Sequence, residues 1–258
     1  MERRIFPLRN KFIKEERKKV GEIPLLKFYP KNSNKKLPTV IYYHGWSSNK
    51  NFQRFKASTI ALYGFQVIVP DAINHGVRNP INFEEENAIE KYFWDTVLHT
   101  VEESSRLLSG IKKYDITDSD RIGVMGSSMG GFIGSGVLIK NEEIKTLIAF
   151  NGACSWIEMD KILREEAEVP EAKEDLIETL KKYDPMKNID MLNQRPVLML
   201  HGDIDTSVPI EGQRSFYEKA INNYKDKDKL QLYEVPDMNH YITADMLQKA
   251  VMWARNYI

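Results

Sequence analysis

A glycine-flanked serine is the residue of this chain best suited to chemistry. Ser128 stands in the run Gly126-Ser127-Ser128-Met129-Gly130. A serine hydroxyl is a weak nucleophile at neutral pH, so it needs a base that accepts its proton and an acid that orients that base. The candidates for the base are the five histidines His44, His75, His99, His201 and His240. This combination indicates nucleophilic acyl transfer through a serine.

The segments on either side of Ser128 predict a strand that turns abruptly into a helix. Residues 121–125 are short, apolar and β-branched, whereas residues 131–140 have helical apolar spacing with small residues on one side. Such a turn strains the serine backbone, and the two flanking glycines let strand and helix approach each other. The start of the helix aims free backbone N–H groups at the hydroxyl. We therefore expect the Met129 N–H to help bind an oxyanion.

Apolar runs alternate with helical patterns along the chain, which is the order that builds a parallel sheet. Strands are expected at 39–43, 65–69, 121–125, 146–150, 196–200 and 230–235, and helices at 52–63, 83–111, 213–222 and 244–257. Residues 1–30 predict two or three antiparallel strands at the edge of the sheet. Helical patterns at 156–167 and 172–183 predict a small cap over residues 154–194. We expect one α/β domain, 1–258, with this cap inserted.

Composition excludes several classes of protein. The 258 residues contain 37 Lys and Arg and 37 Asp and Glu, so no net basic charge favours nucleic acid or an anionic membrane. Cys154 is the single cysteine, and no metal-binding or nucleotide-binding motif occurs, so neither a metal nor a cofactor is expected. The start of the chain lacks an apolar signal core, which predicts a soluble cytoplasmic protein. The oligomeric state stays open, a homodimer included.

Four segments together resemble the α/β-hydrolase superfamily, and in particular small bacterial carboxylesterases related to the dienelactone hydrolase and prolyl oligopeptidase-like branch. They are Tyr43-His44-Gly45-Trp46-Ser47-Ser48, Pro70-Asp71-Ala72-Ile73-Asn74-His75-Gly76, the turn at 126–131, and His201-Gly202-Asp203-Ile204-Asp205-Thr206-Ser207-Val208-Pro209 followed by Asn239-His240. The likeness extends from about residue 40 to the end. It implies an α/β-hydrolase fold, with helices on both faces of a mostly parallel sheet and antiparallel strands at its N-terminal edge.

The resemblance implies a role for each catalytic candidate. In the hydrolase order of serine, acid and base, His240 lies where the base belongs, after the last expected strand and before the last helix. The family pattern selects Asp205 as the acid, while Asp203 is expected to order the loop by accepting backbone hydrogen bonds. His44 and His201 precede glycines at strand ends, where similar proteins use histidines to order loops. His99 lies within an expected helix and is predicted to be structural or exposed.

The remaining site residues follow from the same comparison. The loop after the first central strand should supply the second oxyanion donor, the N–H of Trp46, because Gly45 permits a close approach. His75 could reach the rim of the pocket. Trp156, Ile157 and Met159 could form an acyl pocket from the cap, although apolar residues at helical spacing are also explained by ordinary packing.

The activity implied is that of a serine carboxylesterase acting on small, short-acyl esters, since the cap is modest and no propeller-like domain precedes the catalytic portion. The same residues would serve a thioesterase or an amidase or peptidase, and a non-catalytic binding protein of this fold is a further alternative. Ser128 stands where dienelactone hydrolases carry a cysteine and haloalkane dehalogenases an aspartate, which argues against both of those activities.

Overall fold

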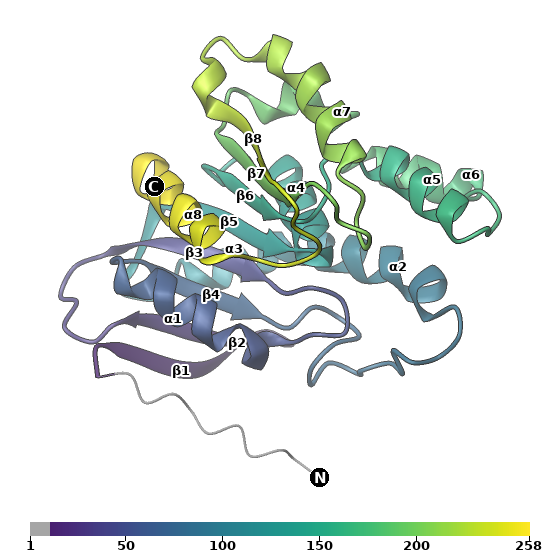
Figure 1. Ribbon diagram of the computed structural model, residues 1–258. Coiled ribbons are helices and arrows are strands. Elements are labelled where there is room, and N and C mark those ends of the chain that lie inside the picture. The colour runs from purple at the N-terminus through teal and green to yellow at the C-terminus, as the bar shows by residue number, and fades with distance from the viewer. Residues whose placement is uncertain (1–10) are drawn as a thin grey trace.

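The computed structural model describes residues 11–258, and in this part of the chain eight strands form one sheet with helices on both faces (Figure 1). The strands are β1 (Ile13–Val20), β2 (Ile23–Pro30), β3 (Leu37–Tyr43), β4 (Gln66–Pro70), β5 (Thr117–Ser127), β6 (Leu147–Phe150), β7 (Val197–Gly202) and β8 (Leu230–Val235). The helices are α1 (Arg54–Leu62), α2 (Ala88–Glu102), α3 (Ser104–Ile111), α4 (Met129–Lys140), α5 (Trp156–Glu166), α6 (Glu174–Lys181), α7 (Glu211–Ala220) and α8 (Ala244–Tyr257). Short 3-10 turns are η1 (Lys50–Gln53), η2 (Ile189–Leu192), η3 (Ile221–Asn223) and η4 (Lys227–Lys229).

The strand order is β1-β2-β4-β3-β5-β6-β7-β8. In this spatial order, each neighbouring pair from β4 through β3, β5, β6 and β7 to β8 is parallel. The pairs β1–β2 and β2–β4 are antiparallel. The predicted fold, a mostly parallel sheet with antiparallel strands at its N-terminal edge, is therefore confirmed. Of the two or three strands expected within residues 1–30, β1 and β2 are present, and residues 1–10 lie outside the described part of the chain.

Successive residues of each strand point to opposite faces of the sheet, so an apolar strand supplies two cores at once. On β3, Ile41 and Tyr43 join the core under α2, α3 and α4, whereas Val40 and Tyr42 join the core under α1 and α8. All four side chains are buried. The two-sided burial fixes the helices against the sheet and holds the carboxyl ends of the parallel strands along one edge.

The single helix expected at 83–111 is wrong, because the structure contains two helices in that range. α2 begins only at Ala88, after Asn87 in the left-handed conformation with a φ of 66°, and it ends at Glu102. The Ser104 hydroxyl donates to the Val101 carbonyl at 2.6 Å, and the Glu103 carboxylate accepts a bidentate pair of hydrogen bonds from Arg78. The Glu103 N–H still donates to His99 and the Leu107 N–H to Glu103, so the break is a local irregularity at Glu103, with a ψ of −6°, that the apolar spacing does not reveal.

The segment 154–194 contains α5 and α6, close to the two expected helices. α5 packs beside α2, where the Trp94 indole donates to the Asp160 carboxylate at 2.6 Å, and beside α7, where the Ser215 hydroxyl donates to Glu158 at 2.8 Å. In Figure 1, α5 and α6 lie at the end of the molecule away from α1 and α8. The division of the chain into one domain with an inserted cap stays a prediction.

Candidate active site

Ser128 lies at the bend between β5 and α4, with a φ of 56° and a ψ of −126°. Residues other than glycine rarely adopt this backbone conformation, which costs about 1–3 kcal/mol of folding free energy. The bend exists because its two flanking glycines have no Cβ. A Cβ on Gly126 would lie 1.9 Å from the Gly130 carbonyl oxygen, and one on Gly130 would lie 2.2 Å from that of Tyr43. The fold thus holds the Ser128 hydroxyl at the carboxyl end of the central strand.

Asp205 and His240 meet beside this edge of the sheet. His240 Nδ1 lies 2.7 Å from Asp205 Oδ2, and the Asp205 side chain is fully buried while that of His240 is 26% exposed. Burial opposes ionisation of Asp205, but hydrogen bonds from His201, His240 and the Val208 N–H outweigh it and hold the pKa of the carboxyl below its ordinary value. Asp205 is therefore a carboxylate at neutral pH, and it orients the imidazole so that Nε2 is free to accept a proton.

The loop that carries Asp205 and the loop that carries His240 can approach because Gly202 ends β7 without a side chain. A Cβ at this position would lie 2.2 Å from the Met238 carbonyl oxygen. The Asp203 carboxylate accepts from the Met238 N–H at 3.3 Å, so it orders the loop and does not contact His240. Asn239 Oδ1 accepts from the N–H groups of Thr206 and His240, which ties the two loops together.

Asn151 links the end of β6 to the same loops, a contribution that the sequence analysis did not assign. Its side chain donates to the Tyr241 carbonyl at 3.0 Å and accepts from the Gly202 N–H at 3.2 Å, and its backbone has a φ of 45°. The one local sign of this role in the sequence is that Asn151 directly follows a buried strand. Its partner Tyr241, 90 residues away in the chain, was not visible from spacing.

Ser128 and His240 line the same cavity, which has a volume of about 650 Å³ and lies between α1 and α8. Asn151, Tyr241 and Ile242 also line it. Of the five histidines, all within the described residues, His240 is the one that shares a cavity with Ser128.

The loop after β3 lies directly against Ser128. A Cβ on Gly45 would lie 3.3 Å from Ser128 Cβ and 3.8 Å from Oγ. The N–H groups of Trp46 and Met129 have no acceptor among residues 11–258. Met129 directly follows Ser128 and Trp46 directly follows Gly45, so both N–H groups are candidate donors to a tetrahedral oxyanion.

A buried polar cluster supports this loop from behind. Asp71 accepts from both the backbone N–H and the ammonium group of Lys50. His44 Nε2 accepts from the Ala72 N–H at 3.1 Å, and burial lowers the pKa of His44 to about 4. His75 is also buried, and its ring lies 5.2 Å from those of His44 and Trp46. Both histidines are therefore neutral and hold the loop in place.

The other two histidines also lie away from the cavity. His201 is fully buried, and its Nε2 donates to the Val208 carbonyl at 2.8 Å and lies 3.4 Å from Asp205 Oδ2. It therefore orders the loop of the acid. His99 is exposed on α2 and contacts Asp95 of the preceding turn.

The three apolar residues suggested for an acyl pocket do not line the cavity that contains Ser128. Trp156 is buried against Trp94, with ring centroids 5.4 Å apart, and its indole donates to Ser135 at 2.9 Å. Met159 is buried beside α7. Ile157 lines a separate cavity of about 450 Å³ among α5, α6 and α7. These residues serve packing because α5 turns its apolar face toward α2 and α7. His75 is likewise absent from the lining, since Trp46 and Phe83 cover its ring.

Residues 11–258 contain neither a candidate metal site nor a candidate membrane span. No group of three or more His, Cys, Asp or Glu side chains is arranged to hold a metal ion. No helix of this part of the chain is long and apolar enough to cross a bilayer.

The sequence was compared with known families and proteins. Residues 106–257 match the model of the prolyl oligopeptidase family. YitV of Bacillus subtilis (strain 168), provisionally named an esterase, is 31% identical over 95% of this chain and 100% of its own length. This chain belongs to the prolyl oligopeptidase family. Within the wider α/β-hydrolase superfamily it is also similar to the esterase YjfP of Escherichia coli (strain K12), 26% identical over 95% of this chain and 100% of that protein.

A solved structure shares the fold of this family member. TT1662 of Thermus thermophilus matches with a TM-score of 0.79 and 18% identity, over 95% of this chain and 97% of the other. The matches to the prolyl oligopeptidase family and to YitV confirm the resemblance to α/β-hydrolases inferred from four sequence segments.

Proposed function

We propose that this chain is a serine carboxylesterase in which Ser128 is the nucleophile, His240 the general base and Asp205 the acid that orients it. The observation that carries the proposal is the 2.7 Å contact between His240 and Asp205 beside a strained serine in a shared cavity. Membership of a serine hydrolase family and two relatives named as esterases support the activity. The proposed substrates are small, short-acyl esters.

The reaction follows from the groups at the site. His240 Nε2 accepts the Ser128 proton while Oγ attacks the ester carbonyl, and the N–H groups of Met129 and Trp46 bind the oxyanion that forms. The ester C–O bond then breaks, and the imidazolium gives its proton to the departing alcohol. A water molecule, deprotonated by His240, attacks the acyl-enzyme and releases the acid. Asp205 stabilises the imidazolium in both half-reactions.

A second function has one specific observation in its favour. The family model that matches residues 106–257 is named for oligopeptidases, whose substrates contain amide bonds. The same residues would cleave an amide by the same steps, with an amine as the leaving group.

A substrate panel tests both functions. The wild type and Ser128→Ala are assayed with p-nitrophenyl esters from acetate to palmitate, with an acyl thioester and with an aminoacyl p-nitroanilide. We expect hydrolysis of the acetate and butyrate esters by the wild type, with the largest kcat/KM at short chains and none by the variant. A higher kcat/KM for the anilide than for the esters would show that the chain is a peptidase and not an esterase. Equal hydrolysis by both proteins would refute Ser128 as the nucleophile.

A further inference from the structure

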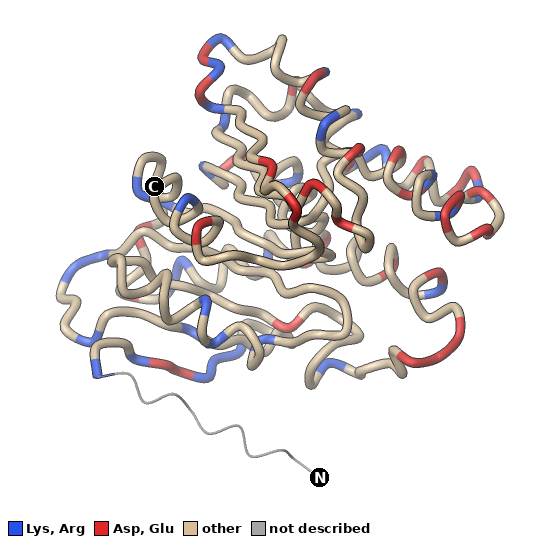
Figure 2. The backbone as a smooth tube through the Cα atoms, in the orientation of Figure 1, with Lys and Arg blue, Asp and Glu red and all other residues tan. Residues whose placement is uncertain are grey.

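Lys56 of α1 lines the cavity that contains Ser128, and no carboxylate among residues 11–258 forms an ion pair with it. Of the residues in the described range that line this cavity, none is an aspartate or a glutamate. Asp205, the carboxylate that contacts His240 Nδ1, has a fully buried side chain and does not line the cavity. α1 itself carries Arg54 and Lys56 and no acidic residue (Figure 2).

Lys56 differs in this respect from the other shielded lysines among residues 11–258. The ammonium group of Lys27 lies 3.1 Å from Glu16, that of Lys140 lies 2.9 Å from Glu102, and that of Lys50 pairs with Asp71. Lys56 instead lies over the ring of Tyr42, with its Nζ 5.8 Å from the ring centroid. Burial by itself lowers the pKa of Lys56, with no charged neighbour to raise it. A half-buried cation without an anionic partner is costly unless a ligand supplies the partner.

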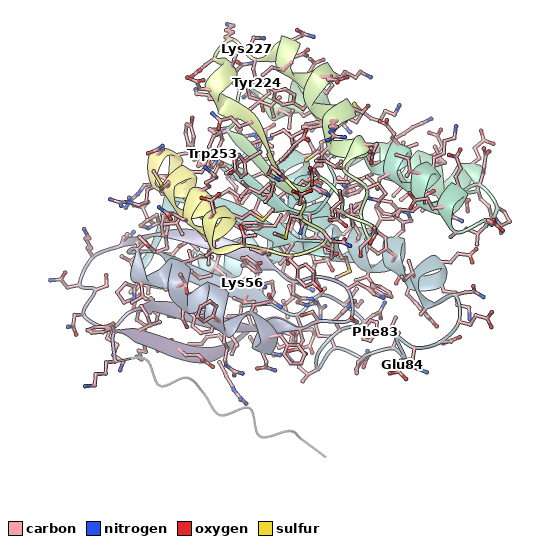
Figure 3. The ribbon with its side chains drawn as sticks, in the orientation of Figure 1. Lys56, Phe83, Glu84, Tyr224, Lys227 and Trp253 are labelled. Atoms are coloured by element: carbon pink, nitrogen blue, oxygen red, sulfur yellow. The ribbon has the colours of Figure 1, made fainter. Side chains whose placement is uncertain are left out.

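Lys56 and Ser128 line the same cavity, and two neighbouring strands connect them. Tyr42 lies on β3 directly opposite Met125 of β5, the strand that leads to Ser128. Figure 3 shows Lys56 between α1 and the chain that leads into α8, the two elements that border the cavity. The cavity wall between them is apolar, with Phe55, Leu247 and Val251. A volume of about 650 Å³ is ample for a small ester, within the range of ligand pockets.

We propose that the substrate is an ester that carries a carboxylate, and that Lys56 determines this specificity by pairing with the carboxylate while Ser128 attacks the ester carbonyl. This inference rests on the proposed esterase function. The carboxylate can belong to the acyl group, as in a half-ester of a dicarboxylic acid, or to the alcohol, and the experiment separates these two sources.

The test compares charged and neutral esters with the wild type, Lys56→Met and Lys56→Arg. p-Nitrophenyl hydrogen glutarate places the charge on the acyl side, 4-carboxyphenyl butyrate places it on the alcohol side, and p-nitrophenyl butyrate is neutral. We expect Lys56→Met to lower kcat/KM by about tenfold for one charged ester and not for the neutral one, since a hydrogen-bonded ion pair is lost. Lys56→Arg should retain most of the preference.

Lys249→Met is the matched control. Lys249 also lies over a tyrosine ring, 4.3 Å from the centroid of Tyr233, but it does not line the cavity. This variant should leave the ratio of charged to neutral kcat/KM unchanged. An equal loss on charged and neutral esters in Lys56→Met, or no loss on either charged ester, would overturn the inference.

A binding measurement separates this inference from the esterase proposal. N-propylglutaramate keeps the carboxylate on the acyl side and 4-(butanoylamino)benzoate keeps it on the alcohol side. Both amides are titrated calorimetrically into each variant together with neutral N-propylbutanamide. We expect one of the two carboxylate compounds to bind the wild type about tenfold more tightly than Lys56→Met, even if no ester is hydrolysed. Hydrolysis of neutral esters without this difference would refute the role of Lys56 and leave the esterase standing. The binding difference without hydrolysis would refute the esterase and leave an anion site.

Discussion

Replacing Asp205 with asparagine changes one atom of the proposed triad, and the surrounding contacts determine how the new side chain must sit. Asp205 Oδ1 accepts from the N–H groups of Ser207 and Val208, both at 2.9 Å. Oδ2 lies 2.7 Å from His240 Nδ1 and 3.4 Å from His201 Nε2. The amide oxygen of an asparagine must keep the Oδ1 position, since only an acceptor can face two backbone donors.

The amide NH₂ group then faces His240 Nδ1. Two donors cannot share that contact, so the imidazole is driven to the tautomer with its proton on Nε2, where it can no longer accept the proton of Ser128. We expect Asp205→Asn to fold and to lose on the order of 10⁴ in kcat, which corresponds to about 5 kcal/mol in the activation barrier.

Asp203→Asn is the matched control, two residues away on the same loop. Asp203 Oδ1 accepts from the Met238 N–H at 3.3 Å, and an amide oxygen can replace it there. This variant should keep most of its kcat and lose about 1 kcal/mol of unfolding free energy. The assay is steady-state hydrolysis of p-nitrophenyl butyrate beside urea melts of both variants. Retention of more than about a tenth of kcat by Asp205→Asn would refute the tautomer argument, and an inactive, folded Asp203→Asn would move the role of the acid to Asp203.

Three further predictions concern the residues that support the site. Asn151→Ala removes two hydrogen bonds and should lower the free energy of unfolding by about 2–3 kcal/mol. It should also lower kcat by about tenfold, because the loop of His240 is then held less firmly. Urea denaturation and steady-state kinetics measure both effects, and an unchanged kcat would contradict this role of Asn151. Ser128→Gly should have an unfolding free energy about 1 kcal/mol higher than that of Ser128→Ala, because glycine relieves the strain at a φ of 56°. Calorimetry of the two inactive variants measures the difference. Identical unfolding free energies would show that no strain is stored. Burial lowers the pKa of His44 from 6.5 to about 4 and also lowers that of His75, so the unfolded chain binds protons that the native fold does not. The free energy of unfolding should therefore be highest above pH 6.5 and fall toward pH 4, by about 1.4 kcal/mol per pH unit and histidine at most. Urea denaturation at pH 7, 5.5 and 4.5 measures this change, and a flat profile would mean that these histidines bind protons as readily in the native fold as in the unfolded chain.

Local sequence determined the elements and the position of the nucleophile. The alternation of apolar runs and helical patterns predicted each parallel strand. For β6 and the first four residues of β7 the reason is that a strand buried on both faces is a continuous apolar run. The glycines that flank Ser128 predicted the bend. The steric reason is local at Gly126, where a Cβ would overlap the Gly130 carbonyl, whereas at Gly130 a Cβ would overlap the Tyr43 carbonyl of β3, which only the folded sheet brings there. The break between α2 and α3 was missed because it consists of one irregular residue, Glu103 with a ψ of −6°, and the apolar spacing carries no sign of it.

Tertiary packing alone determined the surroundings of the site. Trp156 and Met159 have a spacing equally suited to a pocket wall and a core, and only the contact of α5 with α2 and α7 directs both inward. Asn151 and Lys56 are ordinary polar residues in the sequence. They reach the site because β6 and α1, far apart in the chain, both end beside the loop of His240 in the folded sheet. The spacing of apolar residues within a segment determines which face of the helix or strand a side chain lies on. The packing of segments against one another determines which residues that face contacts.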